Sequence, residues 1–349
     1  MHPQILRIID ANCNRISEGL RLLEDIARFV LNDVELSQQL KSIRHAIIAS
    51  LNKFGPDLLS ARNAEGDVGA GIELSQRQDL LSLIMANAKR AEEGLRVIGE
   101  LAKLPEISPT LSSNNFEKAR FQLYTLEREL ASKVLRRQKI ARLKGLYVII
   151  DTQALDFKGE VDATSKAIRG GTRIIQLRDK HYDNGKLLAL AQKMKALCRK
   201  DNALFIINDH LDIALAADAD GLHIGQEDLP LPIVRKELPI DKIIGCSICT
   251  VAQALKAQAG GADYIAAGSI FPTLTKNGAT VIGIEQLKQI KQVISIPLVA
   301  IGGVNRDNMA QVMAAGADAA AVISAVLKQK NIEQATHQLI EEIEQETAS

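Results

Sequence analysis

The chain has 349 residues, of which 46% are hydrophobic and 24% charged, a balance typical of globular proteins. Its 43 basic and 42 acidic residues leave a formal net charge of +1, which argues against a nucleic-acid surface and against a polybasic membrane anchor. Aromatic residues make up 3% and include no Trp, so platforms for stacking nucleic-acid bases are not expected either.

The length predicts two domains at roughly 150 residues per domain. The first residues, Met1 to Gln4, lack a basic region followed by an apolar core, so we expect no secretory signal. No apolar run is long enough to span a bilayer. The four cysteines, Cys13, Cys198, Cys246 and Cys249, favour a reducing compartment over a disulfide framework. We therefore expect a cytoplasmic protein.

Residues 1–138 show helical periodicity almost throughout. Apolar residues recur at helical spacing in four stretches, which run from Ile5 to Ile26, Leu36 to Leu51, Arg77 to Leu104 and Asn114 to Arg137. Gly55-Pro56 is expected to stop the second of these helices. We predict an all-helical N-terminal domain over residues 1–138 and a second domain over residues 139–349.

One helical segment occurs twice. The stretch from Ala11 to Arg21, ANCNRISEGLR, matches the stretch from Ala86 to Arg96, ANAKRAEEGLR. Gly19 and Gly94 would sit in mid-helix, where Gly costs about 1 kcal/mol relative to Ala. We predict an internal duplication in which two related helices cross closely at these glycines.

The polar residues of the repeat allow two interpretations. Asn, Arg and Glu follow one another three residues apart in each copy, so neighbouring side chains are close on the helix surface. A buried Arg–Glu network could fix the crossing of the two helices. Alternatively, the two copies could form a pseudo-symmetric polar pocket, completed by the loop Ala61–Gly69.

From Leu143 onward, short apolar strands alternate with helical segments. Eight such strands, each followed by a helix-like stretch, predict a compact (β/α)8 TIM barrel, with a doubly wound sheet as the alternative. The expected strands are Leu146–Asp151, Ile174–Arg178, Leu204–Asp209, Gly221–Gly225, Lys242–Ser247, Tyr264–Ser269, Pro297–Gly303 and Ala319–Ser324.

Polar and glycine residues fall at the C-terminal ends of these strands, and this is the reason for preferring the barrel. In such barrels this face carries the active site. The residues concerned are Gln176, Arg178, Lys180, Asn208, Asp209, Asp228, Ser247, Thr273, Thr275, Lys276, Gly302, Gly303 and Ser324.

Phosphate chemistry explains these residue types. Gly302-Gly303 and Ser324 follow strands seven and eight, where such barrels commonly bind a phosphate through backbone amides. Asp209 and Asp228 are hard oxygen ligands, and together with a diphosphate they suggest Mg²⁺ as cofactor.

Cations from two sides of the barrel would face a diphosphate leaving group. Arg178 offers a planar fork for phosphate oxygens, and Lys180 and Lys276 offer mobile point charges. The segment after the sixth strand, Thr273–Ala279, is polar and contains a glycine, so we expect it to close over the substrate.

Five short motifs together resemble those of thiamine-phosphate synthases, in the order of that family. They are Ile175–Lys180, Ile207–Asp209, Leu222–Asp228, Pro272–Lys276 and Ala300–Gly303. The resemblance covers nearly the whole second domain. It implies that hydroxymethylpyrimidine diphosphate and a thiazole phosphate carboxylate are joined to give thiamine phosphate, with release of diphosphate and CO₂. The mechanism implied is dissociative and assisted by Mg²⁺.

The resemblance also implies a role for each matching residue. The pyrimidine diphosphate would be held by the stretch from Gln176 to Lys180, which includes Arg178, and by Asn208, Ser247 and Lys276. The thiazole phosphate would be held by Thr273, Thr275, Gly303, Ile323 and Ser324. Lys180, Ser247 and Lys276 would be catalytic, and Asp209 and Asp228 would bind Mg²⁺. The partners implied are these small molecules, with no nucleic acid and no membrane, and a homo-oligomer is left open.

The N-terminal domain resembles a helical module found fused ahead of thiamine-phosphate synthases in some bacteria. A hydroxymethylpyrimidine-phosphate kinase role has been suggested for that module. The region contains no Gly-x-x-x-x-Gly-Lys phosphate loop. The kinase hypothesis therefore depends only on the fusion and on the paired polar stripe.

Two other functions compete for the barrel. A thiazole tautomerase of the same fold would need neither the metal nor the cations around Lys180. A non-catalytic sensor of thiamine phosphate would bind the product without forming it. Product formation from the two substrates with Mg²⁺ separates these functions.

Overall fold

The computed structural model describes residues 2–62, 78–273 and 280–348. Contacts divide the chain into two compact units, Met1–Leu135 and Arg136–Ser349, and each is described by itself. The division falls inside helix α5 (Ser113–Ala141), as does the boundary expected after residue 138.

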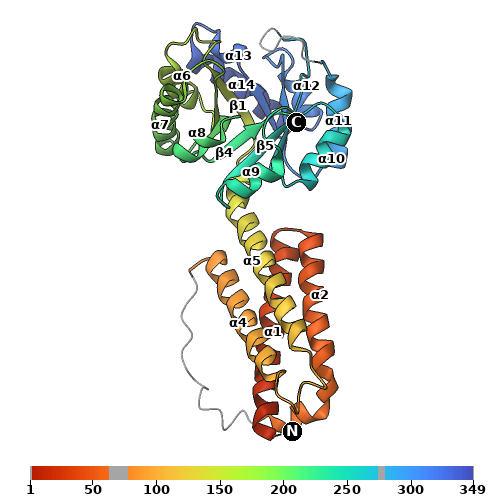
Figure 1. Cartoon of the computed structure of the whole chain (residues 1–349). Coiled ribbons are helices and arrows are strands. Elements are labelled where there is room, and N and C mark those ends of the chain that lie inside the picture. The colour runs from red at the N-terminus through yellow and green to blue at the C-terminus, as the bar shows by residue number, and fades with distance from the viewer. Residues whose placement is uncertain (1, 63–77, 274–279, 349) are drawn as a thin grey trace. The chain divides into compact units, whose positions relative to one another are not determined.

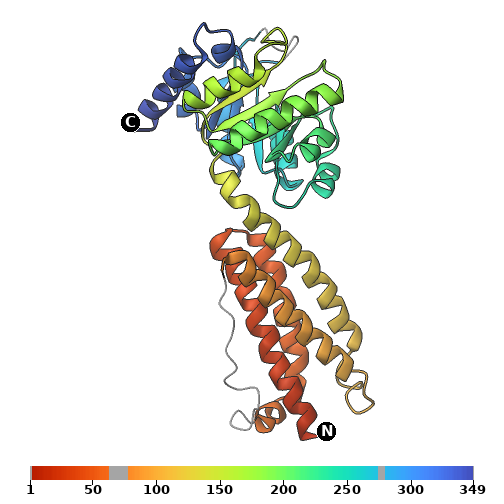
Figure 2. The same cartoon turned by 90° about the vertical axis from the view of Figure 1, so that its left-hand side faces the viewer.

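The first unit is built from helices that pack side by side (Figures 1 and 2). Four long helices were expected and are confirmed, while the short α3 was missed. Proline at the first position of α3 is compatible with a helix start, because its missing N–H would have no partner in the helix. The elements are α1 (Pro3–Asp25), a π-turn (Ile26–Val30), α2 (Val34–Leu51), α3 (Pro56–Ala61), α4 (Leu80–Leu101) and the greater part of α5.

Helices α1 and α4 cross at the two repeated glycines, as predicted. A Cβ placed on Gly19 would lie 2.7 Å from the carbonyl oxygen of Asn87, and one on Gly94 would lie 3.2 Å from that of Asn12 and 2.8 Å from Ile16. Only glycine allows backbones to approach this closely.

Of the two interpretations of the repeat's polar residues, the buried Arg–Glu network at this crossing is wrong. The loop of the other interpretation, Ala61–Gly69, lies mostly outside the described residues. Arg15 and Glu18 of the first copy are exposed, and so is Glu93 of the second. These side chains emerge away from the contact face, and small and apolar residues fill the crossing instead.

The second unit is a closed barrel of eight parallel strands in sequence order, with helices around it (Figure 1). The predicted fold and all eight predicted strands are confirmed. The strands are β1 (Gly145–Asp151), β2 (Ile174–Arg178), β3 (Leu204–Asn208), β4 (Gly221–Ile224), β5 (Ile243–Ile248), β6 (Tyr264–Ala267), β7 (Leu298–Ile301) and β8 (Ala319–Val322).

Helices follow the strands in the (β/α)8 pattern. They are α6 (Glu160–Arg169), α7 (Asn184–Lys200), α8 (Leu211–Ala216), α9 (Leu231–Glu237), α10 (Val251–Ala259), α11 (Gly283–Val293), α12 (Met309–Ala314), α13 (Ser324–Leu327) and α14 (Ile332–Ala348). No helix among the described residues is long and apolar enough to cross a membrane.

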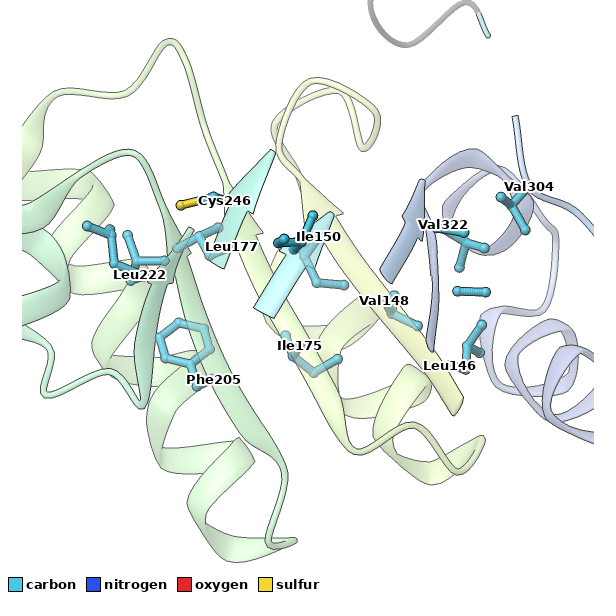
Figure 3. Packing of buried hydrophobic residues seen from close by; sticks show 14 of the residues in the cluster. Leu146, Val148, Ile150, Ile175, Leu177, Phe205, Leu222, Cys246, Val304 and Val322 are labelled. Atoms are coloured by element: carbon cyan, nitrogen blue, oxygen red, sulfur yellow. The ribbon is translucent and has the colours of Figure 1, made fainter. Parts of the chain in front are cut away.

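Strand residues alternate between two apolar layers because side chains point to opposite faces in turn. Residues such as Val148, Ile175 and Leu222 face outward and pack beneath the helices (Figure 3). Tyr147 and Ile206 face inward and fill the barrel. Each strand is therefore covered on both faces, which explains its nearly continuous apolar sequence.

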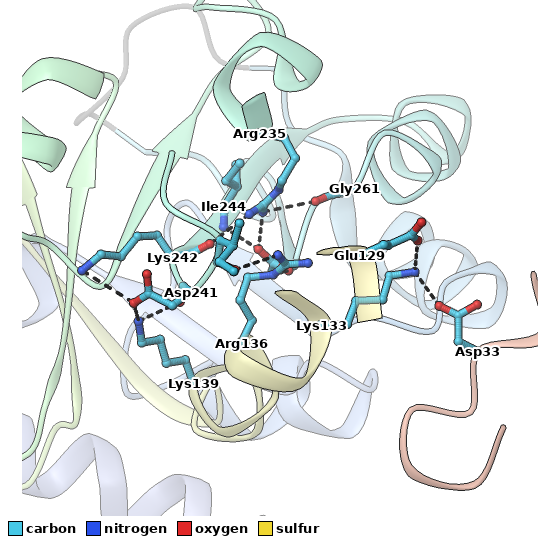
Figure 4. A network of polar contacts seen from close by, with 12 residues as sticks. Asp33, Glu129, Lys133, Arg136, Lys139, Arg235, Asp241, Lys242, Ile244 and Gly261 are labelled. Atoms are coloured by element: carbon cyan, nitrogen blue, oxygen red, sulfur yellow. Dashed lines mark hydrogen bonds and ion pairs between the residues drawn. The ribbon is translucent and has the colours of Figure 1, made fainter. Parts of the chain in front are cut away.

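The last turns of α5 bind the barrel through buried charges (Figure 4). The Arg136 guanidinium donates to Asp263 at 2.8 Å, and Arg235 pairs with the other oxygen of the same carboxylate. Lys139 pairs with Asp241 at 2.9 Å. Burial lowers the pKa of Arg235, although Asp263 opposes that shift. Asp263 is thus the shared counter-charge of two largely buried arginines.

Asp263→Ala should lower the free energy of unfolding of the barrel by about 3–5 kcal/mol, because it leaves two arginines without their carboxylate. Asp218→Ala is the matched control. The Asp218 side chain is 81% exposed and pairs with Lys242, so its loss should cost at most about 1 kcal/mol. Urea unfolding of both variants measures the difference, and equal stability of the two would contradict this role of Asp263.

Glu92 of α4 is buried, and its Oε1 atom has no hydrogen-bond partner among the described residues. Burial and the neighbouring Glu127 raise its pKa to about 7, although Lys89 and Arg120 oppose the shift. The folded chain binds a proton at the Glu92 carboxyl more tightly than the unfolded chain does. Ionisation of Glu92 therefore makes folding less favourable as the pH rises through about 7.

Glu92→Gln should therefore stabilise the chain at pH 8 by about 1–3 kcal/mol, because it removes a negative charge that burial and Glu127 disfavour. At pH 5 the gain should be small, because Glu92 is then protonated in the folded chain. Thermal unfolding at both pH values tests this. A gain that does not depend on pH would show that Glu92 is not the titrating group.

Candidate active site

The carboxyl ends of the eight parallel strands meet at one rim of the barrel, and charged side chains gather there. Arg178, at the end of β2, pairs with Asp151 at the end of β1. Lys180, two residues further on, pairs with Asp209 after β3. Two of the predicted cations are thus held beside carboxylates of neighbouring strands.

The turn that carries Lys180 is fixed by Asp179. Its carboxylate accepts backbone N–H bonds from His181 at 2.8 Å and from Tyr182 at 2.7 Å, and a hydroxyl bond from Thr152. Burial alone would raise the pKa of Asp179, but these hydrogen bonds outweigh it and the pKa is lowered. The turn therefore holds Lys180 at the rim while Asp179 stays ionised.

Asp209 and Asp228 lie close enough to share a hydrogen bond. Burial and this contact raise the pKa of Asp209. Burial acts in the same direction on Asp228, but hydrogen bonds from Asp209 and from the Gly225 N–H at 2.6 Å outweigh it and lower its pKa. Two carboxyls in this arrangement carry one proton more readily than two negative charges.

This donor set fits Mg²⁺. The described residues contain no group of three or more His, Cys, Asp or Glu side chains arranged to hold a metal. Mg²⁺ does not need such a group, because it is usually held by one or two carboxylates together with phosphate oxygens and waters. A divalent cation would also remove the repulsion between Asp209 and Asp228.

A chain of hydrogen bonds crosses the barrel interior beneath the rim. The Gln176 amide donates to the Tyr147 hydroxyl at 2.8 Å, which lies 3.1 Å from the hydroxyl of Tyr264. Tyr264 is 3.0 Å from His223 Nδ1, and His223 Nε2 is 2.8 Å from Ser247 Oγ. Gln176 and Ser247, both predicted site residues, are therefore the two ends of one buried network.

Burial lowers the pKa of His223 to about 4, so its ring is neutral at neutral pH. A neutral imidazole has one donor and one acceptor nitrogen. The His223 ring can therefore orient the hydroxyl groups of Tyr264 and Ser247, one at each nitrogen. His223 is thus a buried, hydrogen-bonded residue of the barrel interior.

The glycines after β7 and the start of α13 provide a separate part of the rim. Gly302 and Gly303 have φ values of +96° and +69°, which strongly favour glycine. A Cβ on Gly303 would lie 2.6 Å from the carbonyl oxygen of Pro272. Ile323 packs against the barrel interior, and the exposed Ser324 begins α13.

Four further predicted positions complete the set. Asn208 ends β3 and is buried, and Thr273 is half-buried. Thr275, Lys276 and most of the expected closing loop lie outside the described residues.

Similarity to known proteins fits this rim. A family model described as thiamine monophosphate synthase matches residues 146–326. A thiamine-phosphate synthase of Synechocystis sp. is 38% identical over 343 residues, which cover 97% of this chain and 96% of that protein. The chain belongs to the thiamine-phosphate synthase family.

Two further proteins of this family are similar to the chain. A thiamine-phosphate synthase of Nostoc sp. is 34% identical over 97% of this chain and 94% of its own. A solved thiamine phosphate pyrophosphorylase of Pyrococcus furiosus covers 60% of this chain and 98% of its own, with 40% identity and a TM-score of 0.56. The chain is therefore a transferase of thiamine biosynthesis. A second family model, described as ThiD2 family, matches residues 7–129.

Sequence reasoning missed four polar residues of the synthase barrel. Tyr147 and Tyr264 look like ordinary strand residues, and nothing local shows that their hydroxyls meet. Asp151 and Thr152 end the first strand, and the rule applied to the other strand ends would have found them. They matter because they pair with Arg178 and Asp179.

Tyr264→Phe should lower the stability of the synthase barrel by about 1–3 kcal/mol, because buried groups of Tyr147 and His223 lose their shared partner. Tyr124→Phe is the matched control, because the Tyr124 side chain is exposed. Chemical denaturation compares the two variants. Indistinguishable effects would mean that the buried hydroxyl contributes little to the network.

Proposed function

We propose that the barrel joins 4-amino-2-methyl-5-(diphosphooxymethyl)pyrimidine to a thiazole phosphate carboxylate, giving thiamine phosphate, diphosphate and CO₂. One observation carries this proposal: Arg178, Lys180 and the carboxylates Asp209 and Asp228 share one part of the rim. A diphosphate with a divalent cation requires this combination of charges.

The diphosphate would bind where cations now pair with carboxylates. The Arg178 guanidinium would leave Asp151 and bind phosphate oxygens. The Lys180 ammonium group would likewise leave Asp209 for phosphate oxygens. Lys276 would add charge from the loop after β6. These cations oppose the negative charge that grows on the leaving group as its C–O bond breaks.

Asp209 and Asp228 would hold Mg²⁺ next to the same oxygens. Mg²⁺ in that position supplies positive charge for the departing diphosphate. Release of Lys180 from Asp209 would leave both carboxylates available for this role.

The pyrimidine ring would lie over the buried network, deeper than the diphosphate. The Gln176 amide and the Ser247 hydroxyl would present polar groups to a heteroaromatic ring, with Asn208 at the end of β3. The network from Tyr147 to His223 orients both groups. Ser247 is proposed as a catalytic residue because it would reach the reacting end of the ring.

The thiazole phosphate would bind across the mouth of the barrel. Backbone amides near Gly303 and Ser324 suit its phosphate, and Ile323 would contact its apolar part. Thr273 and Thr275 would contribute hydroxyls. Departure of diphosphate would come first, and the thiazole nitrogen would then attack the pyrimidine-stabilised cation.

No general base is needed for such a dissociative reaction. His223 is neutral and is engaged by Tyr264 and Ser247. A thiazole tautomerase is disfavoured, because it would not need the cations around Lys180 or the Asp209–Asp228 pair. The pyrimidine-phosphate kinase role of the N-terminal unit stays a hypothesis, and assay of that unit with ATP tests it.

Lys180→Ala and Asp228→Ala should each reduce turnover of the two substrates with Mg²⁺ by about 100-fold or more, because charge on the leaving group loses its stabilisation. Lys193→Ala, at an exposed position on α7, is the control and should keep normal turnover. All three variants should keep the far-UV circular dichroism of the unmodified chain. Near-normal turnover in both site variants would refute the assignment.

A further inference from the structure

The crossing of α1 and α4 has two-fold pseudo-symmetry. Gly19 faces Asn87 and Ala91, and the equivalent Gly94 faces Asn12 and Ile16. Each contact of one copy is repeated by the other with the roles exchanged, so the helices are antiparallel and related by a two-fold axis. Equivalent side chains of such a pair emerge on the same face.

Three charged positions are identical in the two copies although packing does not require them. Arg15, Glu18 and Arg21 recur as Arg90, Glu93 and Arg96, and all six are exposed or half-exposed. Other positions of the same helices have changed: Asn14 corresponds to Lys89, Asp10 to Met85 and Glu24 to Gly99. The two copies thus keep the same exposed charged residues although neighbouring positions have changed. This indicates that the charged residues share a function outside the core.

The contacts place Arg15 and Arg90 on either side of the axis. The axis passes between residues 16 and 17 of α1. Measured along its own helix, each arginine therefore lies about 2–3 Å from the axis, and the two arginines lie about 4.5 Å apart in that direction. Their stems emerge beside the close crossing. Glu18 is about 60° further round α1, away from the contact face.

Neither arginine is neutralised by a residue that the structure describes. Within the described residues, Arg15 and Arg90 have no side-chain hydrogen bond or ion pair, whereas Arg21 pairs with Glu24 and Asp25. Glu93 is paired with Lys89 at 3.9 Å. Two neighbouring guanidinium groups repel each other unless an anion lies between them.

We propose that Arg15 and Arg90 form an oxyanion site on the N-terminal unit, in which both guanidinium forks bind one phosphate group on the pseudo-two-fold axis. Phosphate has oxygens for two forks at once, and arginine binds it through paired hydrogen bonds. The site lies on helices outside the barrel and is independent of the proposed synthase chemistry.

Ile16 provides a local probe, because it contacts Gly94 at the crossing. Methyl NMR of the full chain with labelled isoleucine, titrated with inorganic phosphate, should show a saturable shift of the Ile16 signal. In the Arg15→Ala/Arg90→Ala double variant, the affinity reported by this signal should fall about tenfold or more, because both forks are lost.

The Lys41→Ala/Lys118→Ala double variant is the matched control, because it removes the same charge from exposed positions of the same unit. It should bind phosphate like the unmodified chain. Unchanged signals of isoleucines in the barrel and in α2, measured without phosphate, would verify that both variants fold. An absent Ile16 shift in the unmodified chain, or equal affinities in all three chains, would overturn the proposal. Turnover by the barrel is measured separately, so either result leaves the synthase assignment intact.

Discussion

Closure of the eight-stranded barrel is the constraint on which the site depends. The seam between β1 and β8 completes a ring of parallel strands, so all eight carboxyl ends meet at one rim. Residues separated by many helices along the chain then share a small volume. The ion pairs Arg178–Asp151 and Lys180–Asp209 illustrate this, because each joins residues at or just after the ends of neighbouring strands.

The rim balances its charges before any substrate arrives. Arg178 is paired with Asp151 and Lys180 with Asp209, and Asp209 belongs to the proposed Mg²⁺ site. Binding would replace the carboxylate partners of these cations with phosphate oxygens, so the cations would stay paired with negative charge. The hydrogen-bond network from Gln176 to Ser247 lies beneath the rim. It would hold the side chains below the site in place while the ion-pair partners exchange.

The sequence predicted the barrel well because buried parallel strands leave a clear signature of short apolar runs with polar ends. It also predicted the glycine crossing, since Gly19 and Gly94 interrupt otherwise strong helices. It did not reveal the contact between Tyr147 and Tyr264, because no local pattern joins residues that meet only after closure. The expected Arg–Glu network was wrong because helical spacing brings residues together along one helix and does not say which face is buried.

The N-terminal unit and the barrel illustrate two ways of presenting charge. In the barrel, eight strand ends converge on one rim, whereas in the helical unit a duplicated helix presents the same residues twice about an axis. The central claim concerns the rim, and the full chain incubated with pyrimidine diphosphate, thiazole phosphate carboxylate and Mg²⁺ tests it directly. Thiamine phosphate and diphosphate should appear in equal amounts. Isomerisation of the thiazole without release of diphosphate would contradict the account.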